Sequence, residues 1–193
     1  MRLLVVGGAS SGKSAFAENA ALRLSSSRVY LATMQPFGHE GALRVERHRR
    51  LREGKGFSTV ERCRDLASLE FASCACLQAY SKSDGVFQAA VLVEDLGNLL
   101  ANEMFGDDGT FDGEGALARA DAGMRHVERS FEHVVAVAND VGRDVALQSI
   151  EMQAYVAQLG TLNCMLAARF DAVVEVECGV PHKVKGDAEW CWL

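Results

Sequence analysis

The segment Gly7–Ser14 has the residue types and spacing needed to hold phosphate groups. It reads Gly-Gly-Ala-Ser-Ser-Gly-Lys-Ser and fits the pattern G-x-x-x-x-G-K-[ST]. Glycine lets the backbone adopt positive φ and bring its N–H groups close to phosphate oxygens. Lys13 adds a positive charge near the outer phosphates, and Ser14 offers a hydroxyl to Mg²⁺. The candidate nucleotide-binding residues are therefore Gly7, Gly8, Ala9, Ser10, Ser11, Gly12, Lys13 and Ser14.

A Mg²⁺–nucleotide site also commonly uses a carboxylate at the end of a neighbouring strand. The apolar run 90–93 is followed by Glu94 and Asp95, and either could hold the metal through water. We expect Glu94 to do so because it comes first after the run. The alternative is a solvated strand end, where carboxylates commonly lie.

A basic segment, Arg44–Arg52, places five arginines around His48 in a chain whose net charge is −6. Charge runs of this kind usually form a solvated helix face. The functional alternative is that the His48 imidazole attacks a nucleotide α-phosphorus and forms a covalent phosphoramidate. Arg44 and Arg47 would share a helix face with it, favour its neutral form and stabilise charge on the phosphate.

The elements that must position these residues follow from alternating apolar and helical stretches. Strands are expected over 3–6, 29–32, 57–60, 89–93, 134–138 and 172–176. Helices are expected over 13–24, 40–53, 65–80 with Asp65 as cap, 96–105, 116–130 and 146–170. This alternation predicts a three-layer α/β domain with a mostly parallel central sheet, which is a P-loop NTPase fold given the loop at 7–14. We expect one domain over residues 1–193.

Composition excludes several classes of function. The chain has 193 residues, and its acidic balance argues against a general affinity for nucleic acid. No apolar run reaches the length of a membrane helix, so we expect a cytoplasmic protein without a membrane span. The six cysteines form no Cys-x-x-Cys pair, which favours reduced thiols.

Several segments together resemble one family, the bifunctional adenosylcobinamide kinase / adenosylcobinamide-phosphate guanylyltransferases of cobalamin biosynthesis. The resemblance runs from about residue 2 to residue 185. Besides the phosphate loop, it is carried by Tyr30–Thr33, Arg44–Arg49, Val93–Leu96, Asn102, Ala138–Gly142, Gly160–Asn163 and Gly179–Lys185. The phosphate loop is generic. The specific feature is its combination with the His48 segment and Asn139–Gly142, in the same order and at similar separations.

The resemblance implies a RecA-like P-loop fold, a homotrimer and two activities. ATP or GTP would phosphorylate the aminopropanol hydroxyl of adenosylcobinamide, and GMP would pass from GTP to the resulting phosphate. It implies that His48 carries the GMP and that Lys13 and Ser14 hold phosphate and Mg²⁺. Glu94 would complete the metal site, and Arg47 and Asn139 would belong to the nucleotide pocket.

The chain also departs from the family pattern. Members usually carry R-x-x-R-D before the G-x-x-N, whereas Met152–Ala157 contains neither arginine nor aspartate. Ser10 stands where an arginine is usual, and a threonine after the acidic strand is replaced near Gly97. If the missing groups bind substrate or triphosphate, one activity is weakened or lost. Two other functions therefore stay open, a degenerate nucleotide-binding regulatory module and a kinase lacking guanylyltransferase activity.

Overall fold

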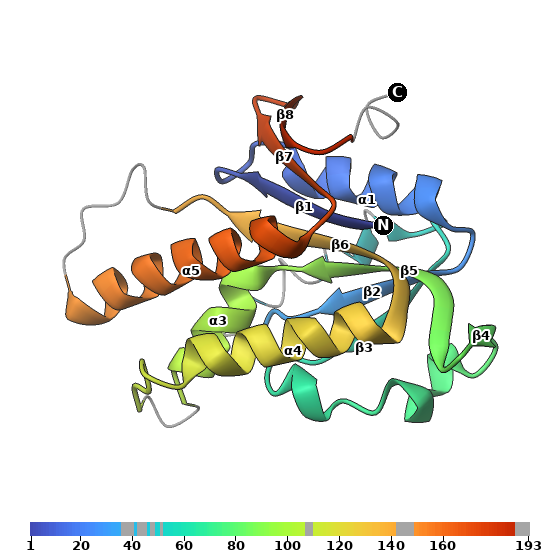
Figure 1. Cartoon of the computed structure of the whole chain (residues 1–193), viewed down its shortest axis with the longest axis horizontal. Coiled ribbons are helices and arrows are strands. Elements are labelled where there is room, and N and C mark those ends of the chain that lie inside the picture. Colours follow the sequence, from blue (N-terminus) through green and yellow to red (C-terminus); the bar gives the residue numbers. More distant parts are fainter. Residues whose placement is uncertain are drawn as a thin grey trace.

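The computed structural model describes residues 1–35, 41, 46, 49–50, 52–106, 110–141 and 149–187. At the centre of this described part lies an eight-stranded sheet (Figure 1) with the order β3-β2-β5-β6-β1-β7-β8, and β4 pairs with β5. The strands are β1 Arg2–Gly7, β2 Arg28–Ala32, β3 Phe57–Glu61, β4 Lys82–Ser83, β5 Val86–Glu94, β6 Phe131–Asn139, β7 Ala172–Glu177 and β8 Val180–Lys185. Neighbours from β3 to β7 run parallel, whereas β4 and β8 are antiparallel to their partners.

Helices cover both faces of this sheet. They are α1 Lys13–Leu24, α3 Leu96–Met104, α4 Ala116–Ser130 and α5 Ile150–Arg169. Helix α1 packs on one face, and α3, α4 and α5 pack on the other (Figure 1). In β1, Leu4 belongs to the core on the α3–α5 side, and Leu3 and Val5 belong to the core beside α1. All three side chains are almost fully buried. A strand buried on both faces must be apolar throughout, which explains the continuous run in the sequence.

The predicted three-layer α/β fold with a mostly parallel central sheet is confirmed. Helices α1 and α4 have the predicted bounds, and the helix predicted over 96–105 ends one residue earlier, at Met104. Of the helix expected over 40–53, residues 41, 46, 49, 50 and 52 are described and helical. Of the helix expected over 146–170, residues 146–148 lie outside the described residues, and α5 spans Ile150–Arg169.

The helix predicted over 65–80 is wrong. The structure has three short 3-10 turns there, η1 Leu66–Ser68, η2 Phe71–Ser73 and η3 Ala75–Leu77. The buried apolar residues Leu66, Phe71 and Leu77 are five and six positions apart, so they cannot form one helical stripe. Asp65 adopts a left-handed conformation with φ 48° and makes no side-chain cap.

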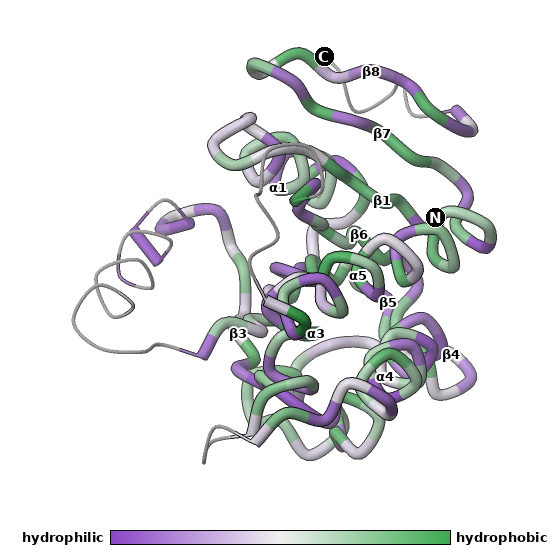
Figure 2. Tube along the Cα trace, turned by 90° about the vertical axis from the view of Figure 1, so that its left-hand side faces the viewer, coloured by the Kyte–Doolittle hydropathy of each residue, from purple (hydrophilic) through white to green (hydrophobic). Residues whose placement is uncertain are grey.

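Strand β8 was missed because its sequence lacks the expected apolar pattern. Most of its residues are exposed, and it adds an antiparallel edge to β7 after the turn at Cys178 and Gly179. Figure 2 shows β7 and β8 side by side at one end of the molecule, with hydrophilic residues along β8. Among the helices that the structure describes, none combines the length and apolar character that a membrane-spanning segment requires.

Two glycines within helices allow a matched test of this packing. A Cβ built at Gly123 of α4 would lie 2.7 Å from Leu66 Cβ, whereas one at Gly160 of α5 would meet nothing within 4 Å. We expect Gly123→Ala to lower the free energy of unfolding by about 1–3 kcal/mol through overpacking. Gly160→Ala should raise it by up to about 1 kcal/mol because alanine favours helix. Urea unfolding measures both, and a Gly123→Ala variant as stable as the parent would contradict the η1–α4 packing.

Candidate nucleotide-binding site

The predicted phosphate loop lies between the end of β1 and the start of α1. Two left-handed residues, Ser10 with φ 57° and Gly12 with φ 93°, turn the chain before the helix begins at Lys13. Lys13 is only 8% exposed, and its Nζ donates a hydrogen bond of 3.1 Å to the Gly8 carbonyl. The lysine charge is thus held across the loop at a helix N-terminus, where backbone N–H groups and the helix dipole both attract anions.

The loop is packed against the turn between β7 and β8. The Gly179 N–H donates a 2.8 Å hydrogen bond to the Ser11 carbonyl. A Cβ at Gly12 would lie 3.2 Å from Gly179 Cα, and one at Gly7 would lie 2.5 Å from the Val176 carbonyl oxygen. Glycine at positions 7 and 12 is therefore required by close approach, and at position 12 by positive φ as well.

Of the two acidic candidates, Glu94 is the one that contacts the phosphate loop. The Ser14 hydroxyl donates a short hydrogen bond to Glu94 Oε1. Glu94 is 8% exposed, and its Oε2 is buried without a hydrogen-bond partner in the described part of the chain. An orphaned carboxylate oxygen beside a serine hydroxyl fits the oxygen ligands that Mg²⁺ prefers. No group of three His, Cys, Asp or Glu side chains suited to a metal occurs among the described residues. A cation here would therefore depend on phosphate and water as well.

Burial raises the pKa of Glu94 from 4.5 to about 7, although the bond from Ser14 opposes this. Burial also raises the pKa of Asp95, against the opposing hydrogen bond from the Asn98 backbone. Asp95 caps α3 by accepting from the Asn98 N–H at 2.7 Å, and its other oxygen accepts from Asn139 Nδ2 at 3.0 Å. Asp95 is thus committed to structural hydrogen bonds, whereas Glu94 keeps a free oxygen beside Ser14.

Asn139 ends β6 directly opposite Gly7, and the Asp140 N–H donates to the Gly7 carbonyl at 3.0 Å. The structure therefore brings Asn139 to the rim of the phosphate loop.

Tyr155 of α5 was not predicted as part of this rim. A Cβ at Gly97 would lie 2.8 Å from its hydroxyl oxygen, and burial, with Asp95 adding, raises the pKa of Tyr155 to about 12. In the sequence, the replacement near Gly97 of the threonine expected from the family pattern was the signal that could have located this contact.

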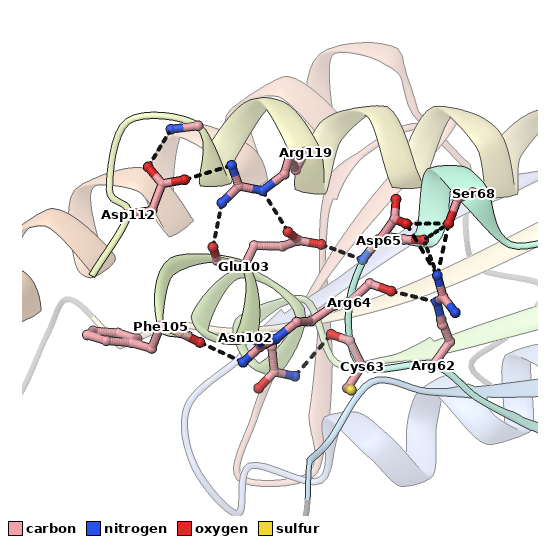
Figure 3. A network of polar contacts seen from close by, with 11 residues as sticks. Arg62, Cys63, Arg64, Asp65, Ser68, Asn102, Glu103, Phe105, Asp112 and Arg119 are labelled. Carbon is pink, nitrogen blue, oxygen red and sulfur yellow. Dashed lines mark hydrogen bonds and ion pairs between the residues drawn. The ribbon is translucent and has the colours of Figure 1, made fainter. Parts of the chain in front are cut away.

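A polar network holds α3, and with it the acidic strand end, in place (Figure 3). Asn102 Nδ2 donates to the Cys63 carbonyl at 3.1 Å. It also donates to the Thr33 carbonyl at 2.7 Å. Glu103 accepts from the Asp65 N–H at 2.6 Å and from Arg119 Nε at 2.8 Å. These bonds tie α3 to the segments that follow β2 and β3 and to α4. Asn102, which resembles a family residue, is therefore structural here.

Not all predicted residues can be placed. Arg44, Arg47 and His48 lie outside the described residues, so the histidine and its arginine neighbour stay predictions. The described residues brought together are the phosphate loop, Glu94 and Asn139.

The raised pKa of Glu94 predicts a pH-dependent stability in the absence of ligand. The folded protein holds this proton more tightly than the unfolded chain. The stabilisation that comes from keeping Glu94 protonated is thus complete below about pH 4.5 and is lost as pH rises to about 7. Glu94→Gln stays neutral, so at pH 8 it should be more stable than the parent by up to about 3 kcal/mol, and the two should converge near pH 4.

Urea unfolding of both proteins between pH 4 and 8 measures this difference. Glu177→Gln, at an exposed carboxylate ending β7, gives the baseline for the substitution itself. A Glu94→Gln difference that does not change with pH would show that folding leaves the pKa of Glu94 unchanged.

Comparison with known proteins identifies the family to which this site belongs. The model of the cobinamide kinase / cobinamide phosphate guanyltransferase family matches residues 3–184. The bifunctional adenosylcobalamin biosynthesis protein CobU of Escherichia coli (strain K12) is 32% identical over 96% of this chain and 100% of its own. The corresponding protein CobP of Pseudomonas aeruginosa is 29% identical over 97% of this chain and 99% of its own.

A solved structure of a prototypical ATPase from the type III secretion system of pathogenic bacteria aligns with a TM-score of 0.45 and 11% identity. The alignment covers 98% of this chain and 60% of that one. The match to the family model over residues 3–184 shows that the chain belongs to the cobinamide kinase / cobinamide phosphate guanyltransferases of cobalamin biosynthesis.

Proposed function

We propose that this member performs both family reactions at one nucleotide site built on the phosphate loop. Membership makes it an enzyme whose substrates are cobinamide, cobinamide phosphate and nucleotides. The observation that carries the residue assignment is the contact between Ser14 and Glu94 beside the buried Lys13. It supports a site in which the cation and hydroxyl at the start of α1 lie beside a carboxylate at the end of β5.

In the kinase reaction, the amides of residues 7–14 would cradle the nucleotide triphosphate, with Lys13 beside its outer phosphates. Ser14 and Glu94 would hold Mg²⁺, which supplies charge neutralisation for the transferred phosphoryl group. The oxygen of the aminopropanol hydroxyl of adenosylcobinamide would attack the γ-phosphorus while the bond to the leaving nucleoside diphosphate breaks and the hydroxyl proton passes to water. ATP and GTP are both proposed as donors, since the phosphate loop contacts only groups that the two share.

In the guanylyltransferase reaction, His48 would attack the α-phosphorus of GTP. A nitrogen–phosphorus bond forms, the bond to pyrophosphate breaks, and GMP is held on the imidazole. The acceptor phosphate then attacks the same phosphorus and returns the imidazole free. Arg47 would stabilise the charge that develops on the phosphate. Asn139, held by Asp95, would shape the rim of the pocket.

Two further features of the proposal rest on the family resemblance, and a third, the cytoplasmic location, rests on the sequence lacking an apolar run of membrane length. The enzyme would be a homotrimer, it would act in the cytoplasm, and His48 would be its covalent carrier. The stretch Met152–Ala157 lacks the charged groups that relatives carry, and the structure puts Tyr155 of that stretch beside Gly97 instead. Both activities therefore need to be measured separately.

Covalent labelling tests the histidine assignment. The parent protein, incubated with Mg²⁺ and GTP labelled at the α-phosphate, should retain acid-labile label after denaturation. His48→Asn should lose that label and the guanylyltransferase activity but keep cobinamide phosphorylation, because the kinase reaction needs no covalent carrier. His182→Asn, on the exposed strand β8, is the matched control.

Each result of this experiment points to one function. A parent that phosphorylates cobinamide but takes no label would be a kinase alone. A parent that binds GTP and does neither would be a degenerate binding module. Label that persists in His48→Asn would refute the histidine assignment.

Lys13→Ala should abolish both activities, since both begin with the same bound triphosphate. We expect a loss of about 100-fold or more in kcat/KM for each reaction. Lys82→Ala, on strand β4 away from the loop, should leave both unchanged. Parallel kinase and transferase assays measure the two losses, and a loss in only one reaction would contradict a single shared nucleotide site.

A further inference from the structure

The structure contains a second buried cation that the phosphate loop does not use. Among the described residues, the basic side chains classed as buried are Lys13 and Arg52, each 8% exposed. Lys13 belongs to the phosphate loop, and Arg52 lies four residues after His48 in the sequence. A buried guanidinium is costly unless an anion or hydrogen-bond acceptors compensate it.

Arg52 has little such compensation within the described part of the chain. Its guanidinium carbon stacks over the Tyr30 ring, 3.3 Å from the ring centroid. Its Nη1 is buried and has no hydrogen-bond partner there. A cation–π contact does not replace hydrogen bonds to a charged donor.

The neighbouring charges are already paired with one another. Lys55 binds the buried Glu18, Arg49 binds Glu61 at 2.6 Å, and Arg50 binds Glu46 at 2.9 Å. Within the described residues no carboxylate pairs with Arg52, because those around it bind other cations. No described side chain or backbone group therefore occupies its buried Nη1.

Arg52 lies on the face of the sheet that also carries the phosphate loop. Tyr30 and Leu92 are paired in β2 and β5, and both belong to the core beside α1. Glu94 is two residues beyond Leu92, so its side chain points to the same face. Burial raises the pKa of Tyr30. The charge of Glu94 raises this pKa further and the charge of Arg52 lowers it, so both charged groups act on the same phenol.

Arg52 also lines a pocket of about 620 Å³ together with Arg49, Phe57 and Thr59.

The two reactions of this enzyme need different anion sites. The kinase acceptor presents a hydroxyl, whereas the guanylyltransferase acceptor presents a phosphate monoester with about two negative charges. The phosphate loop holds the nucleotide triphosphate at the start of both reactions, and pyrophosphate leaves before the acceptor attacks. A phosphorylated acceptor, unlike the unphosphorylated one, can then be held close to the covalent GMP by a further cationic group.

We propose that Arg52, stacked on Tyr30 beside the pocket lined by Arg49, Phe57 and Thr59, binds the phosphate monoester of the acceptor in the guanylyltransferase reaction. This rests on the proposed function, in which GMP is first held on His48. The guanidinium holds the acceptor so that one phosphate oxygen attacks the α-phosphorus. A phosphorus–oxygen bond forms, the phosphorus–nitrogen bond to His48 breaks, and the imidazole regains the electron pair. Arg52 is thereby a specificity-determining residue that separates the phosphorylated acceptor from the unphosphorylated one.

The test separates the steps of the reaction in Arg52→Gln. Self-labelling with α-labelled GTP should proceed at the parent rate, because no acceptor takes part. Cobinamide phosphorylation should keep its KM within about twofold. Transfer of the label to adenosylcobinamide phosphate should require an acceptor concentration about tenfold higher or more, as expected for loss of a charge-assisted hydrogen bond. Arg52→Lys, which keeps the charge, should recover part of that loss.

Arg125→Gln provides the matched control on α4, across the sheet from the phosphate loop, and should behave as the parent. Thermal unfolding of each variant shows whether it is folded. A parent that never takes label would refute the proposed nucleotidyl step itself. A parent that labels normally, with Arg52→Gln transferring label at the parent KM, would refute only the role of Arg52. Equal losses in labelling, phosphorylation and transfer in Arg52→Gln would also overturn it, because Arg52 would then support the fold.

Discussion

The hydrogen bond from Ser14 to Glu94 is the contact on which the geometry of the site depends. It joins the first turn of α1 to the end of β5, although β6 lies between β5 and the strand that feeds the phosphate loop. The parallel register makes this possible, since Gly7 pairs with Asn139 and Val93 pairs with Ala136. All three strands therefore end at the same edge, where ligands of open α/β sheets bind.

Charged side chains at this edge of the sheet are buried away from water. Lys13 and Glu94 are each 8% exposed, and burial disfavours the ionised form of Glu94. Such groups lower stability on their own, so the apolar core on both faces of the sheet must offset them. A bound triphosphate and its cation would supply the missing charges. We propose that substrate binding completes these interactions.

Different interactions lie next to this edge on the two faces of the sheet. On the α3–α5 side, the network around Asn102 and Glu103 (Figure 3) fixes α3 through paired charges and backbone carbonyls. On the α1 side, Arg52 stacks on Tyr30 and keeps an N–H without a partner in the described residues. Satisfied polar groups hold a structure rigid, whereas an unsatisfied buried one needs a partner such as water, an ion or a ligand.

Local features were determined by the sequence alone. The phosphate loop and α1 follow from the apolar strand, the glycines and Lys13, all within a few residues of one another, and α4 follows from its own periodicity. The preference for Glu94 over Asp95 was an inference from order along the chain. Only the tertiary structure shows that Glu94 contacts Ser14 while Asp95 binds Asn139.

The contact of Tyr155 with the Gly97 position, the irregular 3-10 turns between residues 65 and 80, and the β8 edge were also settled only by tertiary structure. Each depends on which strands and helices become neighbours across long sequence separations. Residue types and short-range periodicity carry no information about those pairings, because packing and hydrogen bonds between distant segments decide them.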